Sequence, residues 1–131
     1  MSEISAQYDV VVAGGGPAGA AVATLVAQRG HRVLLGERAT EPRFKVGESL
    51  MPATYPIFER LGVLDRMRES AFPAKHSVQF FGPGGRAGTP FYFSEFDPAE
   101  SSQTWQVRRS EFDAMLLENA AEHGVDVRYG L

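Results

Sequence analysis

Apolar and polar positions near the start of the chain predict a strand, a helix and a second strand. Residues 8–13, with three consecutive valines at 10–12, are interpreted as a buried strand. An Ala- and Val-rich helix is predicted over 18–27, because Arg29-Gly30 is a typical helix ending. The next apolar run, 32–36, predicts the second strand. Together the three elements predict a β–α–β unit.

After residue 37 the pattern breaks into shorter elements. We expect one face of a short helix to carry Ile57, Phe58 and Leu61. Ser110 and Asp113 resemble a capping box at the start of a longer helix. The expected elements are helices at 52–62, 64–69 and 111–123, and strands at 77–81, 91–93, 104–108 and 125–129.

Glycine spacing between the first strand and the helix adds a chemical prediction. Gly14, Gly16 and Gly19 have the G-x-G-x-x-G spacing of a dinucleotide-binding turn. Gly14 permits the tight turn, Gly16 permits close approach to a pyrophosphate, and Gly19 permits close packing of helix and strand. Pro17 suits the first helical turn. The residues predicted to bind the nucleotide here are Gly14, Gly15, Gly16, Pro17, Ala18 and Gly19.

An acidic residue stands where this type of site needs one. Glu37 follows the second predicted strand, and its carboxylate can accept hydrogen bonds from both ribose hydroxyls of an adenosine. The same charge would repel a 2′-phosphate. FAD or NAD is therefore favoured over NADP. The fold class predicted from the strands, helices and glycines is α/β: a Rossmann-like domain interrupted by inserted short helices and strands.

Composition narrows the function classes. The chain has 131 residues, enough for one small domain, and a formal net charge of −3 without a basic stripe, which argues against nucleic acid. No apolar run approaches the ~20 residues of a membrane span. Residues 1–7 lack signal-peptide features and are expected to be a flexible leader. The absence of cysteine fits a cytoplasmic protein. The three histidines lack ligand spacing, so no metal site is predicted.

Lysine is rare in this chain. Only Lys45 and Lys75 occur, beside eleven arginines. An amine can give up its proton in a chemical step and a guanidinium cannot, so each lysine is a candidate for amine chemistry. The residues alone leave open that both are ordinary surface lysines.

Several segments carry a resemblance to a known family. Gly14 to Gly19 with Glu37-Arg38 is similar to FAD monooxygenases of the para-hydroxybenzoate hydroxylase type and to geranylgeranyl reductases. Segments 42–52, 72–76, 80–82 and 105–113 more narrowly resemble the N-terminal part of flavin-dependent halogenases of the phenol and pyrrole type. The resemblance covers nearly all of residues 8–130.

The resemblance implies an FAD cofactor, reduced to FADH2 in turnover, and a halide ion. It implies that Lys75 is the catalytic amine, which holds or activates the halogen beside an electron-rich aromatic ring. Gly47, Glu48 and Ser49 would lie along the flavin ring and ribityl chain, and Arg109 would meet the flavin or its phosphates. The nucleotide site would also include Glu37 and Arg38. The implied substrate is a small phenol- or pyrrole-like aromatic, free or tethered to a carrier protein, and a separate flavin reductase would supply the reduced flavin.

Two other functions stay open from the sequence. One is an FAD-dependent aromatic hydroxylase or prenyl-chain reductase, which needs no amine near the ring, so Lys75 separates it from a halogenase. The other is a nucleotide-binding module without catalysis. A flavoprotein of this layout needs more sheet and a wall for the substrate, so we interpret residues 8–131 as the N-terminal part of an FAD-binding domain that is incomplete at its C-terminus. The Trp-x-Trp-x-Ile-Pro motif of many halogenases and a Gly-Asp ribityl-binding motif would lie beyond Leu131.

Overall fold

A parallel three-stranded sheet forms one layer of the fold. The computed structural model describes residues 7–41 and 43–131, so the expected leader at 1–7 falls almost wholly outside the described residues. Strands β1 (Val10–Ala13), β2 (Val33–Glu37) and β7 (Asp126–Tyr129) lie in the order β1-β2-β7. Val10 pairs with Val33, and Leu34 with Asp126. The last strand of the chain therefore joins the sheet beside β2, after a long insertion.

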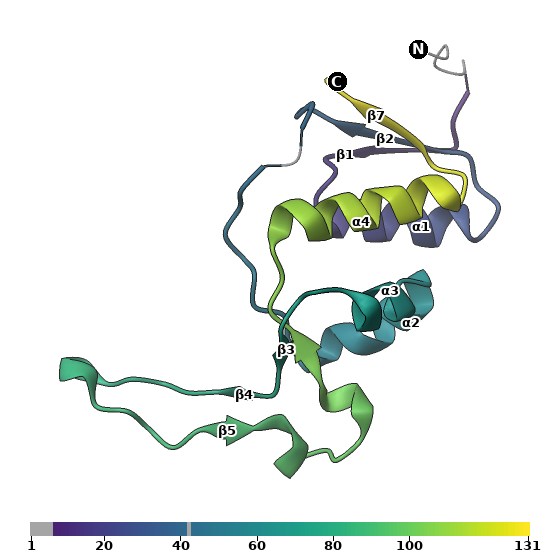
Figure 1. Cartoon of the computed structure of the whole chain (residues 1–131). Helices are drawn as coiled ribbons and strands as arrows, with labels where there is room; N and C mark the ends of the chain where they lie inside the picture. Colours follow the sequence, from purple (N-terminus) through teal and green to yellow (C-terminus); the bar gives the residue numbers. More distant parts are fainter. Residues whose placement is uncertain (1–6, 42) are drawn as a thin grey trace.

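Two helices lie side by side against one face of this sheet (Figure 1). They are α1 (Pro17–Ala27) and α4 (Arg109–Glu122). Ala20 and Ala23 of α1 and Ala120 of α4 are buried, and these small side chains let the helices approach each other and the strands closely. Leu35 of β2 is fully buried beneath them. The α/β, Rossmann-like architecture predicted from the sequence is confirmed.

A second layer packs on the far side of the two long helices. It holds the short helices α2 (Tyr55–Leu61) and α3 (Leu64–Glu69). Trp105 stacks on Tyr55 with ring centroids 6.2 Å apart, and Phe58 meets Phe112 of α4 edge-on at 5.8 Å. These aromatic contacts join the inserted segment to α4. The core is therefore continuous from the sheet through the helices to Trp105.

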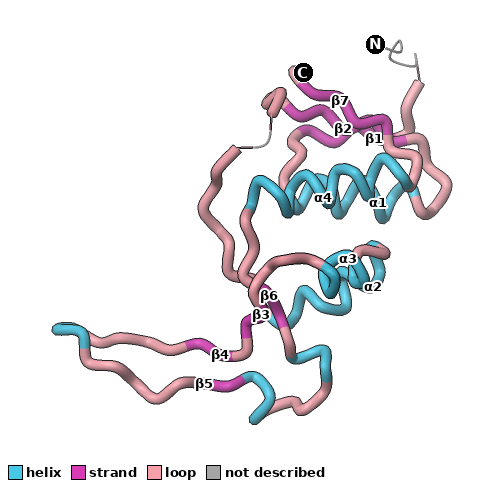
Figure 2. Tube along the Cα trace, viewed as in Figure 1, coloured by secondary structure: helices cyan, strands magenta, loops and turns pink. Residues whose placement is uncertain are grey.

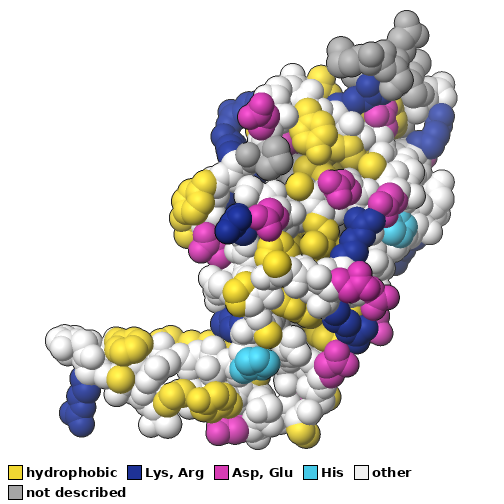
Figure 3. All heavy atoms as spheres, viewed as in Figure 1, with side chains coloured by type: hydrophobic (Ala, Val, Ile, Leu, Met, Phe, Trp, Pro, Cys, Tyr) yellow, Lys and Arg dark blue, Asp and Glu magenta, His cyan; other side chains and the backbone are white. Residues whose placement is uncertain are grey.

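Two small antiparallel pairs complete the insertion. Strand β3 (Ala74–Lys75) pairs with β6 (Thr104–Trp105), and β4 (Ser77–Val78) pairs with β5 (Phe91–Tyr92). The β4–β5 hairpin extends away from the helices (Figure 2). Hydrophobic side chains lie along it (Figure 3). Its large exposed apolar residues are Phe80, Phe81, Phe91 and Tyr92.

The types of the elements were predicted better than their bounds and buried faces. The strands expected at 77–81 and 104–108 are only two residues long, because β4 pairs with β5, and β6 with β3, over two residues each. Ile57 is exposed, against the prediction that it shares the buried face of Phe58 and Leu61. The capping box was also wrong. Helix α4 begins at Arg109, so Ser110 lies inside it, and its N-cap makes no side-chain hydrogen bond.

Candidate nucleotide site and lysine site

The glycine turn has the geometry that its spacing predicts. Gly14 has φ +104°, a conformation that favours glycine, and its N–H donates to the Gly36 carbonyl at 2.7 Å. A Cβ on Gly19 would stand 2.0 Å from the Gly14 oxygen, so this glycine is needed for packing. A Cβ on Gly16, the N-cap of α1, would meet no atom within 4 Å. Gly16 therefore leaves an open approach to the first turn of α1, whose unpaired N–H groups favour an anion.

Glu37 ends β2 and is fixed by two backbone donors. The Ala39 N–H donates to Oε1 at 2.8 Å, and the Gly15 N–H donates to Oε2 at 2.7 Å. These two hydrogen bonds lower the pKa of Glu37 below its ordinary value, and the bond from Ala39 has the larger effect. Burial of the carboxylate acts in the opposite direction. Each carboxylate oxygen keeps acceptor capacity for a further donor. The group is thus an oriented anion that can receive ribose hydroxyls.

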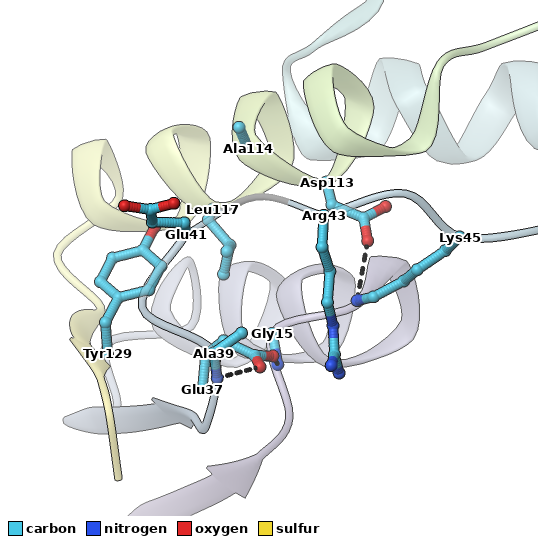
Figure 4. Close-up of a pocket in the computed structure, with 10 residues that line it drawn as sticks. All are labelled: Gly15, Glu37, Ala39, Glu41, Arg43, Lys45, Asp113, Ala114, Leu117 and Tyr129. Carbon is cyan, nitrogen blue, oxygen red and sulfur yellow. Dashed lines mark hydrogen bonds and ion pairs between the residues drawn. The ribbon is translucent and has the colours of Figure 1, made fainter.

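A small pocket opens beside this carboxylate. In Figure 4 the Glu37 side chain lies near Gly15, between Tyr129 on one side and the Lys45–Asp113 pair on the other. The lining residues are Gly15, Glu37, Ala39, Glu41, Arg43, Lys45, Asp113, Ala114, Leu117 and Tyr129. The mixture of apolar wall, oriented acid and cations suits a nucleoside with phosphates. Arg38, predicted to contribute, is exposed and is not among these residues.

Asp113 joins two cations from different parts of the chain. It accepts from Arg109 through Nε at 2.8 Å and Nη2 at 3.2 Å, and from Lys45 Nζ at 3.2 Å. The Asp113 hydrogen bond raises the pKa of Arg109 above its ordinary value, against the effect of burial. Arg109 Nη1 also donates to the Val46 carbonyl at 3.0 Å. We call this group, Asp113 with Arg109 and Lys45, the Asp113 clasp. It fastens segment 45–47 to α4.

Gly47 is adapted to this contact. Its φ is +104°, and a Cβ there would stand 3.0 Å from Arg109 Nη1. The chain then runs beside β6. The Val107 N–H donates to the Glu48 carbonyl at 2.7 Å, and the Leu50 N–H donates to the Trp105 carbonyl at 3.1 Å. Segment 47–50 is therefore held as an extended piece between the nucleotide pocket and the β3–β6 pair.

Lys75 lies at the far end of that segment. Its Nζ donates to the Leu50 carbonyl at 3.0 Å and stands 5.6 Å from the centre of the Phe93 ring. A carbonyl and an aromatic face both stabilise an ammonium. The structure thus places Lys75 beside the residues expected along the flavin, Gly47, Glu48 and Ser49. Whether these residues and Arg109 contact a flavin stays a prediction.

The predicted residues therefore form two groups joined by segment 45–50. The nucleotide group contains Gly14 to Gly19 and Glu37, and the lysine group contains Lys75. Sequence reasoning missed Asp113 and Lys45 as members of the first group. The four-residue spacing from Arg109 to Asp113 could have indicated their ion pair. No local signal links Lys45 to Asp113, because they meet only in the tertiary structure.

The fold, the glycine turn and the oriented acid define a dinucleotide-binding domain. Comparison with known proteins identifies the family. The profile of the tryptophan halogenase family matches residues 9–119. The chain belongs to this family of flavin-dependent enzymes, as the sequence resemblance predicted.

Individual relatives agree with this assignment. Over 131 residues the chain is 39% identical to a 1H-pyrrole-2-carbonyl-[peptidyl-carrier protein] brominase of Pseudoalteromonas luteoviolacea, covering 100% of this chain and 30% of the relative. It is 34% identical to the corresponding chlorinase of Pseudomonas fluorescens, covering 95% of this chain and 31% of the relative. The solved structure of the myxobacterial chondrochloren halogenase CndH matches with a TM-score of 0.85 at 44% identity, covering 94% of this chain and 28% of that one.

The chain spans about 30% of the length of these relatives. That coverage agrees with the expectation that the sequence corresponds to part of a longer enzyme. A more distant structure, Pseudomonas aeruginosa PqsL, matches with a TM-score of 0.78 at 24% identity and shares the fold. Within the described residues no helix is long and apolar enough to cross a membrane.

Proposed function

We propose that this chain is the FAD-binding and lysine-bearing part of a flavin-dependent halogenase that acts on an electron-rich aromatic ring. The observation that carries the proposal is the position of Lys75. This lysine is held by the Leu50 carbonyl at 3.0 Å, at the end of the segment that leads from the nucleotide pocket. An aromatic hydroxylase has no use for an amine fixed at this place.

The described residues fit an FAD molecule. Glu37 presents acceptors for ribose hydroxyls, and the open position at Gly16 admits a diphosphate to the first turn of α1. Segment 47–49 leads from there toward Lys75. When bound and reduced, FAD would react with oxygen and a halide to supply hypohalous acid near the segment.

Lys75 then acts on the halogen. Its ammonium donates a hydrogen bond to the oxygen of hypohalous acid, which makes that oxygen a better leaving group when a ring carbon attacks the halogen. The oxygen takes a proton from the ammonium and leaves as water, and the neutral amine then accepts the proton that the ring loses as it regains aromaticity. Leu50 and Phe93 hold the ammonium in place during this step. A guanidinium at this position would be too broad and too weak an acid to replace it.

The relatives support a substrate class. Both the brominase and the chlorinase act, by name, on a pyrrole carried by a peptidyl carrier protein. We propose a phenol- or pyrrole-like ring for this protein, free or tethered to such a carrier. A separate reductase would supply the reduced flavin, and the enzyme would work in the cytoplasm, where reduced nicotinamide cofactors are available to that reductase.

The test replaces the corresponding part of the Pseudoalteromonas brominase with this chain, to which it is 39% identical. FAD content of the chimera is measured first, and bromination of the carrier-bound pyrrole is then followed by mass spectrometry. Lys75→Ala should lower bromination by about a hundredfold or more, the usual scale for a lost proton donor, and keep FAD bound. His76→Ala, at the exposed neighbouring position, is the matched control and should keep full activity.

Other outcomes would replace the proposal. A chimera that brominates equally well with Lys75→Ala would exclude the catalytic role of the amine. Oxygen insertion into the ring instead of bromine, unchanged by Lys75→Ala, would establish the hydroxylase alternative. An intact, folded chimera that binds FAD but inserts neither bromine nor oxygen into the ring would favour a module without catalysis.

A further inference from the structure

The hydroxyl of Thr104 is buried without a hydrogen-bond partner. Thr104 has 0% exposure, and its Oγ1 is the one buried side-chain polar atom of the described residues that lacks a partner. Folded proteins rarely keep such an atom, because a buried hydroxyl loses its hydrogen bonds to water and gains nothing in return. Valine would fill the same space without this cost. The hydroxyl therefore calls for a functional explanation.

The position of Thr104 in the fold suggests a function for its hydroxyl. In the antiparallel β3–β6 pair, Thr104 lies directly opposite Lys75. Directly opposed residues project to the same side of a sheet, with Cβ atoms about 5 Å apart. The four-carbon stem of a lysine can span that distance by rotating about its side-chain bonds. The hydroxyl is thus within reach of the Lys75 ammonium, which at present donates to the Leu50 carbonyl.

The Lys75 ammonium can donate more hydrogen bonds than the one it makes to Leu50. An ammonium carries three N–H groups, and the structure commits one of them to Leu50. The Phe93 ring lies 5.6 Å from Nζ and stabilises a cation without fixing its direction. The ammonium can therefore turn from one acceptor to another without leaving the aromatic face.

We propose that Thr104 is a positioning residue for Lys75, and that its hydroxyl is a second acceptor for the ammonium. Lys75 has two positions, one on the Leu50 carbonyl and one on the Thr104 hydroxyl. The second position holds the amine at β6 when it leaves Leu50. The proposal rests on the proposed function, because Thr104 acts on the reaction only through Lys75.

The test measures the reactivity of Lys75 directly. The folded chain is treated with limiting acetic anhydride at several pH values from about 7 to 10, around the range where amines titrate. Peptide mass spectrometry then gives the acetylation rates of Lys75 and of Lys45. Since these are the only two lysines, Lys45 serves as an internal reference in every sample.

Thr104→Val removes the hydroxyl and keeps the shape of the side chain, whereas Thr104→Ser keeps the hydroxyl. With one acceptor lost, the amine is freer, and Lys75 in Thr104→Val should acetylate at least about threefold faster relative to Lys45, the scale of a partly occupied hydrogen bond to a charged group. Thr104→Ser should label at the wild-type rate. The faster labelling should persist across the pH series.

A purely structural hydroxyl gives a different result. If Thr104→Val unfolds at a higher denaturant concentration than wild type and labels Lys75 at the wild-type rate, the hydroxyl is only an unsatisfied group and the proposal is overturned. Should Thr104→Val fail to fold, the comparison of Thr104→Ala with Thr104→Ser replaces it, and equal Lys75 labelling in those two variants overturns the proposal as well. The labelling needs no halogenation, so its outcome is distinct from the loss or retention of activity in Lys75→Ala.

Discussion

Replacing Gly19 by alanine tests the contact that brings helix α1 against the end of strand β1. The new Cβ would stand 2.0 Å from the Gly14 oxygen and 3.4 Å from Val12 Cγ1. Real Cβ atoms essentially never approach another atom closer than 3.0 Å, so the Gly14 oxygen and the helix must separate by at least 1.0 Å. The Gly14 carbonyl is backbone and cannot rotate away alone. The strain therefore falls on the packing between α1 and the sheet.

The destabilisation by this clash can be compared with the higher helix propensity of alanine. Overpacking of a tight interface costs about 1–3 kcal/mol and sometimes more, and a clash with backbone belongs at the upper end. Alanine gains at most about 1 kcal/mol over glycine in a helix. We expect Gly19→Ala to lower the free energy of unfolding by about 2 kcal/mol. For a chain of this length that corresponds to a fall of roughly 8 °C in Tm.

Gly16→Ala is the matched control in the same turn. Its φ of −74° suits alanine, and the added Cβ meets no atom within 4 Å. Its free energy of unfolding should stay within about 0.5 kcal/mol of wild type. The methyl group would nevertheless occupy the approach to the first turn of α1, so the affinity for ADP should fall by about tenfold or more. The two glycines therefore separate a packing role from a binding role.

Urea unfolding followed by the fluorescence of Trp105 measures both variants. Trp105 is the only tryptophan and is 3% exposed, so its emission reports on the core between α4 and the second layer. ADP binding is measured by calorimetry on the folded protein. A Gly19→Ala variant as stable as wild type would refute the close approach of α1 to Gly14. Undiminished ADP binding by Gly16→Ala would refute a diphosphate at the helix start.

Two further predictions concern the nucleotide pocket. Backbone hydrogen bonds, the one from the Ala39 N–H first, lower the pKa of Glu37 in the folded protein. The ionised Glu37 carboxylate therefore stabilises the fold fully above its ordinary pKa of 4.5, and this stabilisation is lost as the pH falls through the folded pKa. Glu37→Gln should therefore flatten the decline of Tm below about pH 4.5, and a Tm–pH curve as steep as wild type would contradict this. Asp113→Asn should lower the free energy of unfolding by about 2 kcal/mol, because Arg109 and Lys45 lose hydrogen bonds to a charged carboxylate. Glu111→Gln, which removes an exposed ion pair from the same helix, should change it by less than ~1 kcal/mol, and equal losses in urea unfolding would argue against the clasp.

The local chemistry of the nucleotide turn was readable from the residues in order. Glycine spacing, the proline at the helix start and the acid after the second strand act over short stretches of chain, so the sequence predicted the β–α–β unit and the position of Glu37. Helix α3 was predicted with its observed bounds, because its apolar periodicity and the proline after it are local signals. The family resemblance added Lys75 and segment 47–49, which no periodicity reveals.

Contacts between distant segments were decided only by the tertiary structure. Asp113 looked like part of a helix cap, but α4 begins four residues earlier, at Arg109, and Asp113 instead binds a lysine 68 positions away in sequence. Strand β7 reaches β2 after a long insertion, and Thr104 meets Lys75 across a two-residue strand pair. Sequence patterns report what a residue does to its own helix or strand. Which residues from separate elements share one pocket depends on how those elements pack, and packing is set by the whole chain together.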